Sequence, residues 1–363
     1  MTRIPPPKQK PRARDLGLPV PGTPGPFNAI TDVPGVLVGF TTLTDPARRM
    51  RTGVTAIRPR PDRDRPEPVY AGFFSFNGNG EMTGTHWIAD AGYMQGPILI
   101  TNTHGIGACH HGATAWMMRH YGPYFREETA WAMPVVAETY DGGLNDITAL
   151  HVRPEDAEAA LDAAAAGPVA EGSVGGGNGM IAYEFKAGTG TASRRVTVGG
   201  QGYMLGVLVQ ANFGRRPWFT PLGVPVGAEM PVKAQPAQRD QGSIIVVIAT
   251  DAPLSDTLLS QLARRASLGI GRSGTVGGNS SGDLFLAFST ATTTREGAVE
   301  IRRTLDRDQI DPLYQAAVEA VDEAVLNAIV QGEDVPFVKP MGKICEGIDT
   351  GRLVELMRKY GRM

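Results

Sequence analysis

The sequence has only two cysteines, Cys109 and Cys345, and almost no net charge. Two cysteines so far apart cannot build the disulfide framework of a small secreted domain. A formal net charge of -2 at pH 7 gives no electrostatic reason to expect nucleic acid or an anionic membrane as a partner. No apolar run is long enough to span a membrane, and residues 1–27 contain no apolar stretch typical of a secretory signal. We therefore expect a cytoplasmic protein.

Motifs for metal and nucleotide chemistry are also lacking. The chain has no His-Glu-x-x-His pair, and the adjacent His110 and His111 would point about 100° apart on a helix, so we expect no metal. The glycine-rich stretch 172–179 lacks the lysine and spacing of a P-loop, so we interpret it as a structural turn that shapes a cleft and expect no cofactor. A cysteine hydrolase built on Cys109 and a histidine such as His104 stays open. The simpler interpretation of that segment is a helix N-terminus with partly buried imidazoles.

The composition otherwise predicts a globular protein with a sizeable core, in one large domain or two ordinary ones. Residues 1–27, rich in proline and basic side chains, predict an extended arm that wraps its own domain or a partner subunit. Strands and helices are mixed without strict alternation, which favours a layered α/β sandwich over a doubly wound sheet. We expect strands at 35–40, 53–57, 69–76, 97–101, 134–137, 203–210, 244–250 and 283–289, and helices near 108–121, 154–166, 254–268 and 311–330.

The most informative segment is the junction Gly242-Ser243. Residues 215–241 hold prolines, glycines and charges without periodicity, which predicts a functional or cleavable linker, and a strongly apolar strand follows at once. Glycine has no Cβ, so the Gly242 carbonyl can be approached closely. This combination suits a serine that attacks its own preceding peptide bond and thereby gains a free amine, which unites nucleophile and base in one residue. The alternative is an ordinary loop-to-strand junction.

Other polar residues also stand at strand ends. Glu138 and Tyr140 follow the strand at 134–137, where a carboxylate could hold a substrate ammonium and a phenol could donate to an oxyanion. Asn212 ends one strand, and Ser281 and Asp283 begin another. An amide, a hydroxyl and carboxylates at these strand ends could converge on Ser243, and the sequence alone does not show whether they do.

Several motifs occur together, in one order, along almost the whole chain. The junction segment 240–254 resembles the self-cleavage site of the L-aminopeptidase/D-amidase-D-esterase and β-aminopeptidase family. Further segments resemble the same family: 28–36, 78–84, 101–104, 138–142, 206–214 and 278–283.

The resemblance implies a four-layer αββα sandwich of the type shared with ornithine acetyltransferases. It implies a single catalytic domain over 28–363 that cuts itself into pieces 1–242 and 243–363, and a homotetramer of processed protomers. The implied substrate is a small peptide, amide or ester with a free N-terminal amine, including D-alanyl amides and esters. The rival activities are a β-aminopeptidase, an acyl transferase like the ornithine acetyltransferases, and a non-catalytic glycine-rich binding protein that would stay uncut.

Roles for single residues follow from the same resemblance. Ser243 would be the nucleophile of self-cleavage and of peptide hydrolysis, with its freed amine as the base. Asn212 and the Tyr140 hydroxyl would stabilise the oxyanion, and Glu138 would hold the substrate ammonium. Two further residues, Ser281 and Asp283, would tune the amine and hydroxyl of Ser243. The related acetyltransferases use threonine as the nucleophile, so serine at this position favours hydrolysis.

Overall fold

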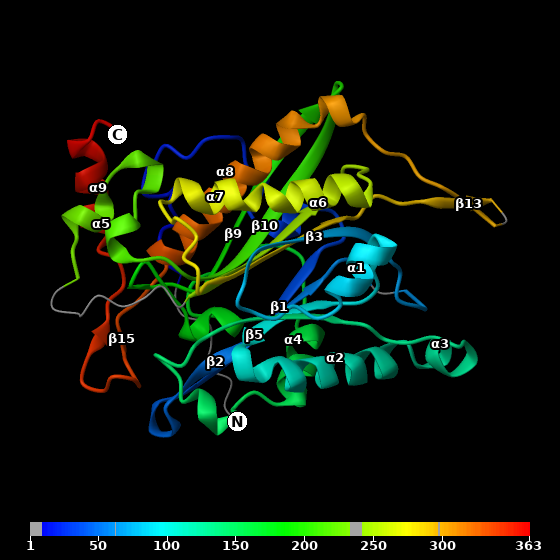
Figure 1. The fold of residues 1–363 in the computed structure, drawn as a ribbon, viewed down its shortest axis with the longest axis horizontal. Coiled ribbons are helices and arrows are strands. Elements are labelled where there is room, and N and C mark those ends of the chain that lie inside the picture. The colour runs from blue at the N-terminus through cyan, green and yellow to red at the C-terminus, as the bar shows by residue number, and fades with distance from the viewer. Residues whose placement is uncertain (1–8, 62, 233–241, 297) are drawn as a thin grey trace.

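The structure is a computed structural model that describes residues 9–61, 63–232, 242–296 and 298–363 (Figure 1). Two β-sheets form its centre. The smaller sheet has four strands in the order β1 (Leu37–Asp45), β2 (Met50–Arg58), β5 (Ile98–Asn102) and β6 (Val135–Thr139). The larger sheet has six strands in the order β4 (Tyr93–Met94), β3 (Val69–Gly78), β12 (Gly282–Ser289), β11 (Ser243–Thr250), β10 (Gln201–Asn212) and β9 (Thr189–Val198). All eight strands expected from the sequence are present.

The alternation of apolar side chains along the strands explains the layers. On β11, Ile245 and Val247 pack between the two sheets, whereas Ile244 and Val246 pack on the opposite face under helices. A third apolar cluster lies between the small sheet and its own helices. The four-layer αββα sandwich is therefore confirmed. The large sheet is covered by α6 (Asp256–Arg264), α7 (Ala266–Arg272) and α8 (Asp311–Val330), and the small sheet by α2 (Ile106–His120) and α4 (Pro154–Asp162).

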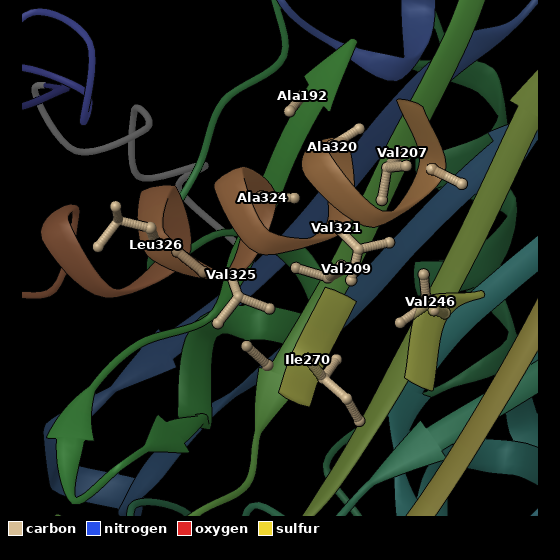
Figure 2. Packing of buried hydrophobic residues seen from close by; sticks show 14 of the residues in the cluster. Ala192, Val207, Val209, Val246, Ile270, Ala320, Val321, Ala324, Val325 and Leu326 are labelled. Carbon is tan, nitrogen blue, oxygen red and sulfur yellow. The ribbon is translucent and has the colours of Figure 1, made fainter. Parts of the chain in front are cut away.

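Helix α8 coincides with the helix expected at 311–330, and Figure 2 shows its apolar face packed over the large sheet. The helix expected at 254–268 is instead two shorter helices, α6 and α7, and the second extends into the glycine-rich loop expected from 269. The other helices are α1 (Thr85–Ala91), α3 (Gly122–Glu127), α5 (Val226–Glu229) and α9 (Thr350–Lys359). Short strand pairs are β7 (Ile181–Ala182) with β8 (Phe185–Lys186), β13 (Thr294–Glu296) with β14 (Val299–Ile301), and β15 (Val335–Pro336) with β16 (Ile344–Cys345).

The prediction of a long linker over 215–241 is largely wrong for its first part. Residues 215–232 fold against the domain, with Phe219 and Val226 fully buried. Arg216 is buried as well, and its guanidinium donates to the carbonyl oxygens of Tyr183, Glu184 and Met230 at 2.7–2.9 Å. A segment without periodicity is thus held by one buried cation and a few apolar anchors. Residues 233–241 of the expected linker lie outside the described residues.

The described part of the N-terminal arm, from residue 9, lies on its own domain. Arg12 pairs with the buried carboxylate of Glu171 at 2.7 Å, and Arg14 pairs with that of Glu323 at 2.8 Å. Of the two alternatives for the arm, these contacts support wrapping of its own domain. Residues 1–8 of the expected arm lie outside the described residues, and the boundary at 27/28 stays a prediction. No helix in the described part of the chain is long and apolar enough to span a membrane.

The glycine-rich stretch 172–179 is a structural turn, as expected. Residues Gly175–Gly179 form a buried 3₁₀ helix wedged against both sheets. A Cβ on Gly175 would lie 2.4 Å from Thr55 Oγ1 of the small sheet, and one on Gly176 would lie 2.2 Å from Gln210 Oε1 of the large sheet. Glycine is needed here because the backbone itself fills the space between the sheets.

The contact between α8 and β9 gives a stability prediction. A Cβ on Gly190 would lie 2.0 Å from the Ala324 carbonyl oxygen, so we expect Gly190→Ala to lower the free energy of unfolding by about 1–3 kcal/mol through overpacking. Gly202→Ala on β10 is the matched control, since a Cβ there meets nothing within 4 Å. Urea titration of both variants checks this, and equal midpoints would contradict it.

Candidate active site

Ser243 is the first residue of β11 and is paired on both sides. It stands opposite Asn212 in the antiparallel pairing with β10 and opposite Gly282 in the parallel pairing with β12. Its side chain has the same orientation along the strand as Ile245 and Val247, so it faces the space between the two sheets. With only 5% of its surface exposed, Ser243 has the fixed position that the sequence suggested.

The backbone amide of Gly282 is a shared hydrogen-bond donor for the carbonyl and the hydroxyl of the Gly242-Ser243 junction. The Gly282 N–H donates to the Gly242 carbonyl oxygen at 3.3 Å and to Ser243 Oγ at 3.2 Å. A Cβ on Gly282 would lie 2.9 Å from Ser243 Oγ and 2.3 Å from the Asn79 carbonyl oxygen, so the close approach requires glycine. The hydroxyl and the carbonyl that it would attack are therefore held by the same donor.

The Asp283 carboxylate is buried beside this junction and is held by several donors. Its Oδ1 accepts from the Ser281 hydroxyl at 2.6 Å and from the Ile244 N–H at 3.2 Å. Its Oδ2 accepts from Asn77 Nδ2 at 3.0 Å. The structure thus brings the predicted pair Ser281 and Asp283 together next to Ser243, and it adds Asn77, which the sequence reasoning missed.

A β-bulge explains how Asn77 reaches this carboxylate. In the pairing of β3 with β12, Asp283 stands opposite Asn77, whereas the next residue, Leu284, stands opposite Ser75. The extra residue, Phe76, leaves the regular ladder, and such bulges redirect side chains near sites. The only signal in the sequence was the polar Asn-Gly-Asn-Gly end of this strand.

Asn212 has its amide on the same face of the sheet as Ser243, because the two residues are directly opposed. Its Oδ1 accepts from the Ile181 N–H, and its Nδ2 donates to the Tyr140 carbonyl oxygen, both at 2.9 Å. An amide nitrogen carries two hydrogens, so one more donor is present on this fixed group. The contact also ties Tyr140, whose side chain is 47% exposed, to the strand that flanks Ser243.

Asp141 supports the turn that carries Tyr140. Its carboxylate accepts from Asn102 Nδ2 at 3.0 Å and from Asn145 Nδ2 at 3.1 Å. Burial raises the pKa of Asp141 to about 6, although these hydrogen bonds oppose the shift. Asp141 lies in the segment 138–142 that resembles the family, but no role was predicted for it.

Glu138 lies near the end of β6 and is only 4% exposed. Its Oε1 accepts from the Glu81 N–H at 3.1 Å, and its Oε2 accepts from the Thr103 hydroxyl. Burial raises the pKa of Glu138, and the hydrogen bonds from Thr103 and the Glu81 backbone lower it in part. A Cβ on Gly80 would lie 3.3 Å from Glu138 Oε1 and 3.4 Å from Gly282 Cα, so this carboxylate is separated from the Ser243 junction by one glycine.

The cysteine alternative is wrong. Cys109 is fully buried in the cluster between the small sheet and its helices, and burial raises the pKa of its thiol to about 12. A nucleophilic cysteine needs a thiolate and access to the substrate, and this residue has neither at neutral pH. The described residues contain no group of three or more His, Cys, Asp or Glu side chains placed to hold a metal ion.

Comparisons with known proteins point to one family over most of the chain. The model of Peptidase family S58 matches residues 28–341. Two curated relatives are both named "Beta-peptidyl aminopeptidase BapA". The protein from Sphingosinicella microcystinivorans is 45% identical, covering 97% of this chain and 93% of the relative. The protein from Sphingosinicella xenopeptidilytica is 42% identical, covering 89% and 85%.

Solved structures match over nearly the full length. The L-aminopeptidase D-Ala-esterase/amidase from Ochrobactrum anthropi, described as a prototype of the serine aminopeptidases and a new variant of the Ntn hydrolase fold, is 52% identical. Its TM-score is 0.92, with 97% of this chain and 99% of that chain covered. A β-aminopeptidase from Burkholderia sp. is 44% identical with a TM-score of 0.88, with 96% and 99% covered.

Proposed function

Since this chain belongs to peptidase family S58 and is a serine aminopeptidase, we propose that Ser243 is its nucleophile and that the chain itself cuts the bond before Ser243. Membership confirms the resemblance drawn from the sequence motifs, and it removes the acyl-transferase and binding-protein alternatives. The observation that carries the proposal is the Gly282 N–H, which lies within hydrogen-bond distance of both Ser243 Oγ and the Gly242 carbonyl oxygen.

Self-cleavage is the first proposed step. Ser243 Oγ attacks the Gly242 carbonyl carbon, and the Gly282 N–H donates to the oxygen on which negative charge develops. The C–N bond breaks, the nitrogen takes the hydroxyl proton, and Gly242 is left as an ester on Ser243. Water then cleaves the ester, which frees the Gly242 carboxylate and restores the hydroxyl. Before this step the nitrogen is an amide and cannot act as a base.

The freed amine of Ser243 is the proposed base of turnover. An α-amine has an ordinary pKa of about 7.7–8.0, which suits proton transfer near neutral pH. It takes the hydroxyl proton as Ser243 Oγ attacks the substrate acyl carbon, and it returns the proton to the leaving amine. Asn212 Nδ2 and the Tyr140 hydroxyl donate to the oxyanion. Water releases the acyl group in a second round of the same chemistry.

Glu138 is the proposed site for the substrate's terminal ammonium. A buried carboxylate one glycine away from the junction holds the free N-terminus next to the nucleophile, which limits the enzyme to exopeptidase action. The proposed substrates are small N-terminal residues of peptides, amides and esters, and the solved relative at 52% identity is named an L-aminopeptidase D-Ala-esterase/amidase. Ser281 and Asp283, which a hydrogen bond joins to each other, are proposed to tune the amine and hydroxyl of Ser243.

A β-aminopeptidase is the second candidate, because relatives at 45% and 44% identity carry that name. Relative rates on the amides of L-alanine, D-alanine and β-alanine separate the two candidates. A homotetramer of processed protomers and a cytoplasmic location also remain proposals. The first rests on the family resemblance and the second on the composition.

A denaturing gel with N-terminal sequencing tests the proposed cleavage. We expect two bands from the purified protein, because the freed amine is needed as the base, and the smaller band should begin Ser-Ile-Ile-Val. An intact 38.6 kDa chain with full aminopeptidase activity would contradict the proposal.

A further inference from the structure

The Glu138 carboxylate is fixed from two sides by groups that the mechanism above does not use. The Thr103 hydroxyl donates to Oε2, and the Glu81 N–H donates to Oε1 at 3.1 Å. Gly80 lies beside the same carboxylate, since a Cβ on this glycine would come within 3.3 Å of Oε1. Both oxygens are therefore occupied by fixed donors, and the carboxylate cannot rotate without losing one of them.

The position of Thr103 follows from the sheet. Strands β5 and β6 run parallel, with Thr101 opposite Glu138 and Asn102 opposite Thr139, so both strands end at the same edge. Thr103 is the first residue after β5 and begins a 3₁₀ turn that ends at Gly105. A Cβ on Gly105 would lie 2.7 Å from Thr101 Oγ1, so this turn is packed tightly against its own strand. The backbone thus fixes the Thr103 hydroxyl on its neighbour's carboxylate.

We infer that Thr103 is a positioning residue that gives the enzyme its selectivity for substrates with a free primary ammonium. Its hydroxyl favours the ionised form of Glu138 and keeps the carboxylate in one orientation, so that an ammonium meets a charged acceptor. The inference rests on the proposed role of Glu138. A hydrogen bond to an ionised carboxylate is stronger than one between neutral groups, so its loss is measurable in binding.

The electrostatic surroundings of Glu138 make this hydroxyl important. Burial is the largest influence and raises its pKa, and the Glu81 carboxylate raises it further. The Thr103 hydroxyl, the Glu81 N–H and His104 lower it. Removing the hydroxyl therefore moves the pKa of Glu138 upward. Because ammonium binding needs the ionised carboxylate, the acid limb of kcat/KM must then move to higher pH.

Thr103→Val tests the inference, because valine keeps the shape of threonine and removes the hydroxyl. With alanine p-nitroanilide we expect KM to rise about tenfold or more while kcat changes little, and the acid limb to shift upward. With propionyl p-nitroanilide, which lacks only the amino group, kcat/KM should stay unchanged, so the preference for the ammonium substrate falls. Thr103→Ser restores a hydroxyl and should restore KM and the pH profile.

Other results would overturn the inference. An unchanged KM and pH profile in Thr103→Val would do so, as would an equal loss on both substrates. Processing involves no substrate ammonium, so an uncut Thr103→Val chain would reveal a structural role instead and would also overturn it. Failure of the proposed role of Glu138 is distinguishable, since it would show as an unaltered enzyme that does not prefer alanine p-nitroanilide to propionyl p-nitroanilide, whatever Thr103 does.

Discussion

Ser243→Ala is expected to remain a single uncut chain and to lose at least about 10⁴-fold in turnover. Alanine removes the hydroxyl that attacks Gly242, so neither the cut nor the free amine can form. No other nucleophile easily takes the place of this hydroxyl, because Ser243 is only 5% exposed and its Oγ lies 3.2 Å from the Gly282 nitrogen. A denaturing gel and rates on alanine p-nitroanilide measure both effects on one preparation.

Ser280→Ala is the matched control for that experiment. Ser280 lies just before β12, the strand beside β11, and its carbonyl oxygen, not its hydroxyl, accepts from Asn79 Nδ2 at 2.7 Å. Normal cleavage and turnover are expected in this control. If Ser243→Ala were cut at the same bond or kept its activity, the assignment of the nucleophile would be wrong.

Asn212→Ala is expected to slow turnover roughly a hundredfold or more. Removing one oxyanion donor typically raises the barrier by about 2.7–4 kcal/mol, and this donor stands directly opposite Ser243. Because the loss concerns the transition state, it should fall on kcat more than on KM. The measurement is the rate per processed chain, with the processed fraction read from a gel.

The structural contacts of Asn212 require a second variant. Its Oδ1 holds the Ile181 N–H and its Nδ2 holds the Tyr140 carbonyl, so alanine also loosens the neighbouring segments. Asn212→Asp keeps an acceptor for Ile181 but provides no N–H, and we expect no recovery of kcat. Recovery in Asn212→Asp, or normal turnover in fully processed Asn212→Ala, would contradict the role as an oxyanion donor.

The core elements were predictable because their signals are local. Strand β11 is a nearly continuous apolar segment and helix α8 has an apolar stripe at helical spacing, and both lie where the sequence placed them. Strand β9 was missed because it carries Ser193 and Arg194, which are polar yet buried. Arg194 is compensated by Glu323 of α8 at 2.8 Å, a contact between residues far apart in the chain. Local patterns carry no information about such an ion pair.

The candidate site divides in the same way. Residues at strand ends, such as Ser243 and Asn212, could be singled out because the end of a predicted strand places a residue at an edge of the sheet. Asn77 and Thr103 could not, because their roles depend on strand register. Asn77 reaches Asp283 only through a bulge, and Thr103 reaches Glu138 only because two parallel strands end together.

The interior position of β11 has a consequence for the life of the cleaved protein. The bond before Ser243 lies just outside the pairings of β11 with β10 and β12, so cutting it removes none of them. One molecule forms these contacts within itself, whereas two separated pieces would first lose translational and rotational freedom, at about 4–15 kcal/mol. In this proposal the uncut chain therefore folds as one molecule, and the two pieces keep the native state after cleavage. Its persistence depends on the height of the unfolding barrier, because unfolded pieces have no intramolecular route back.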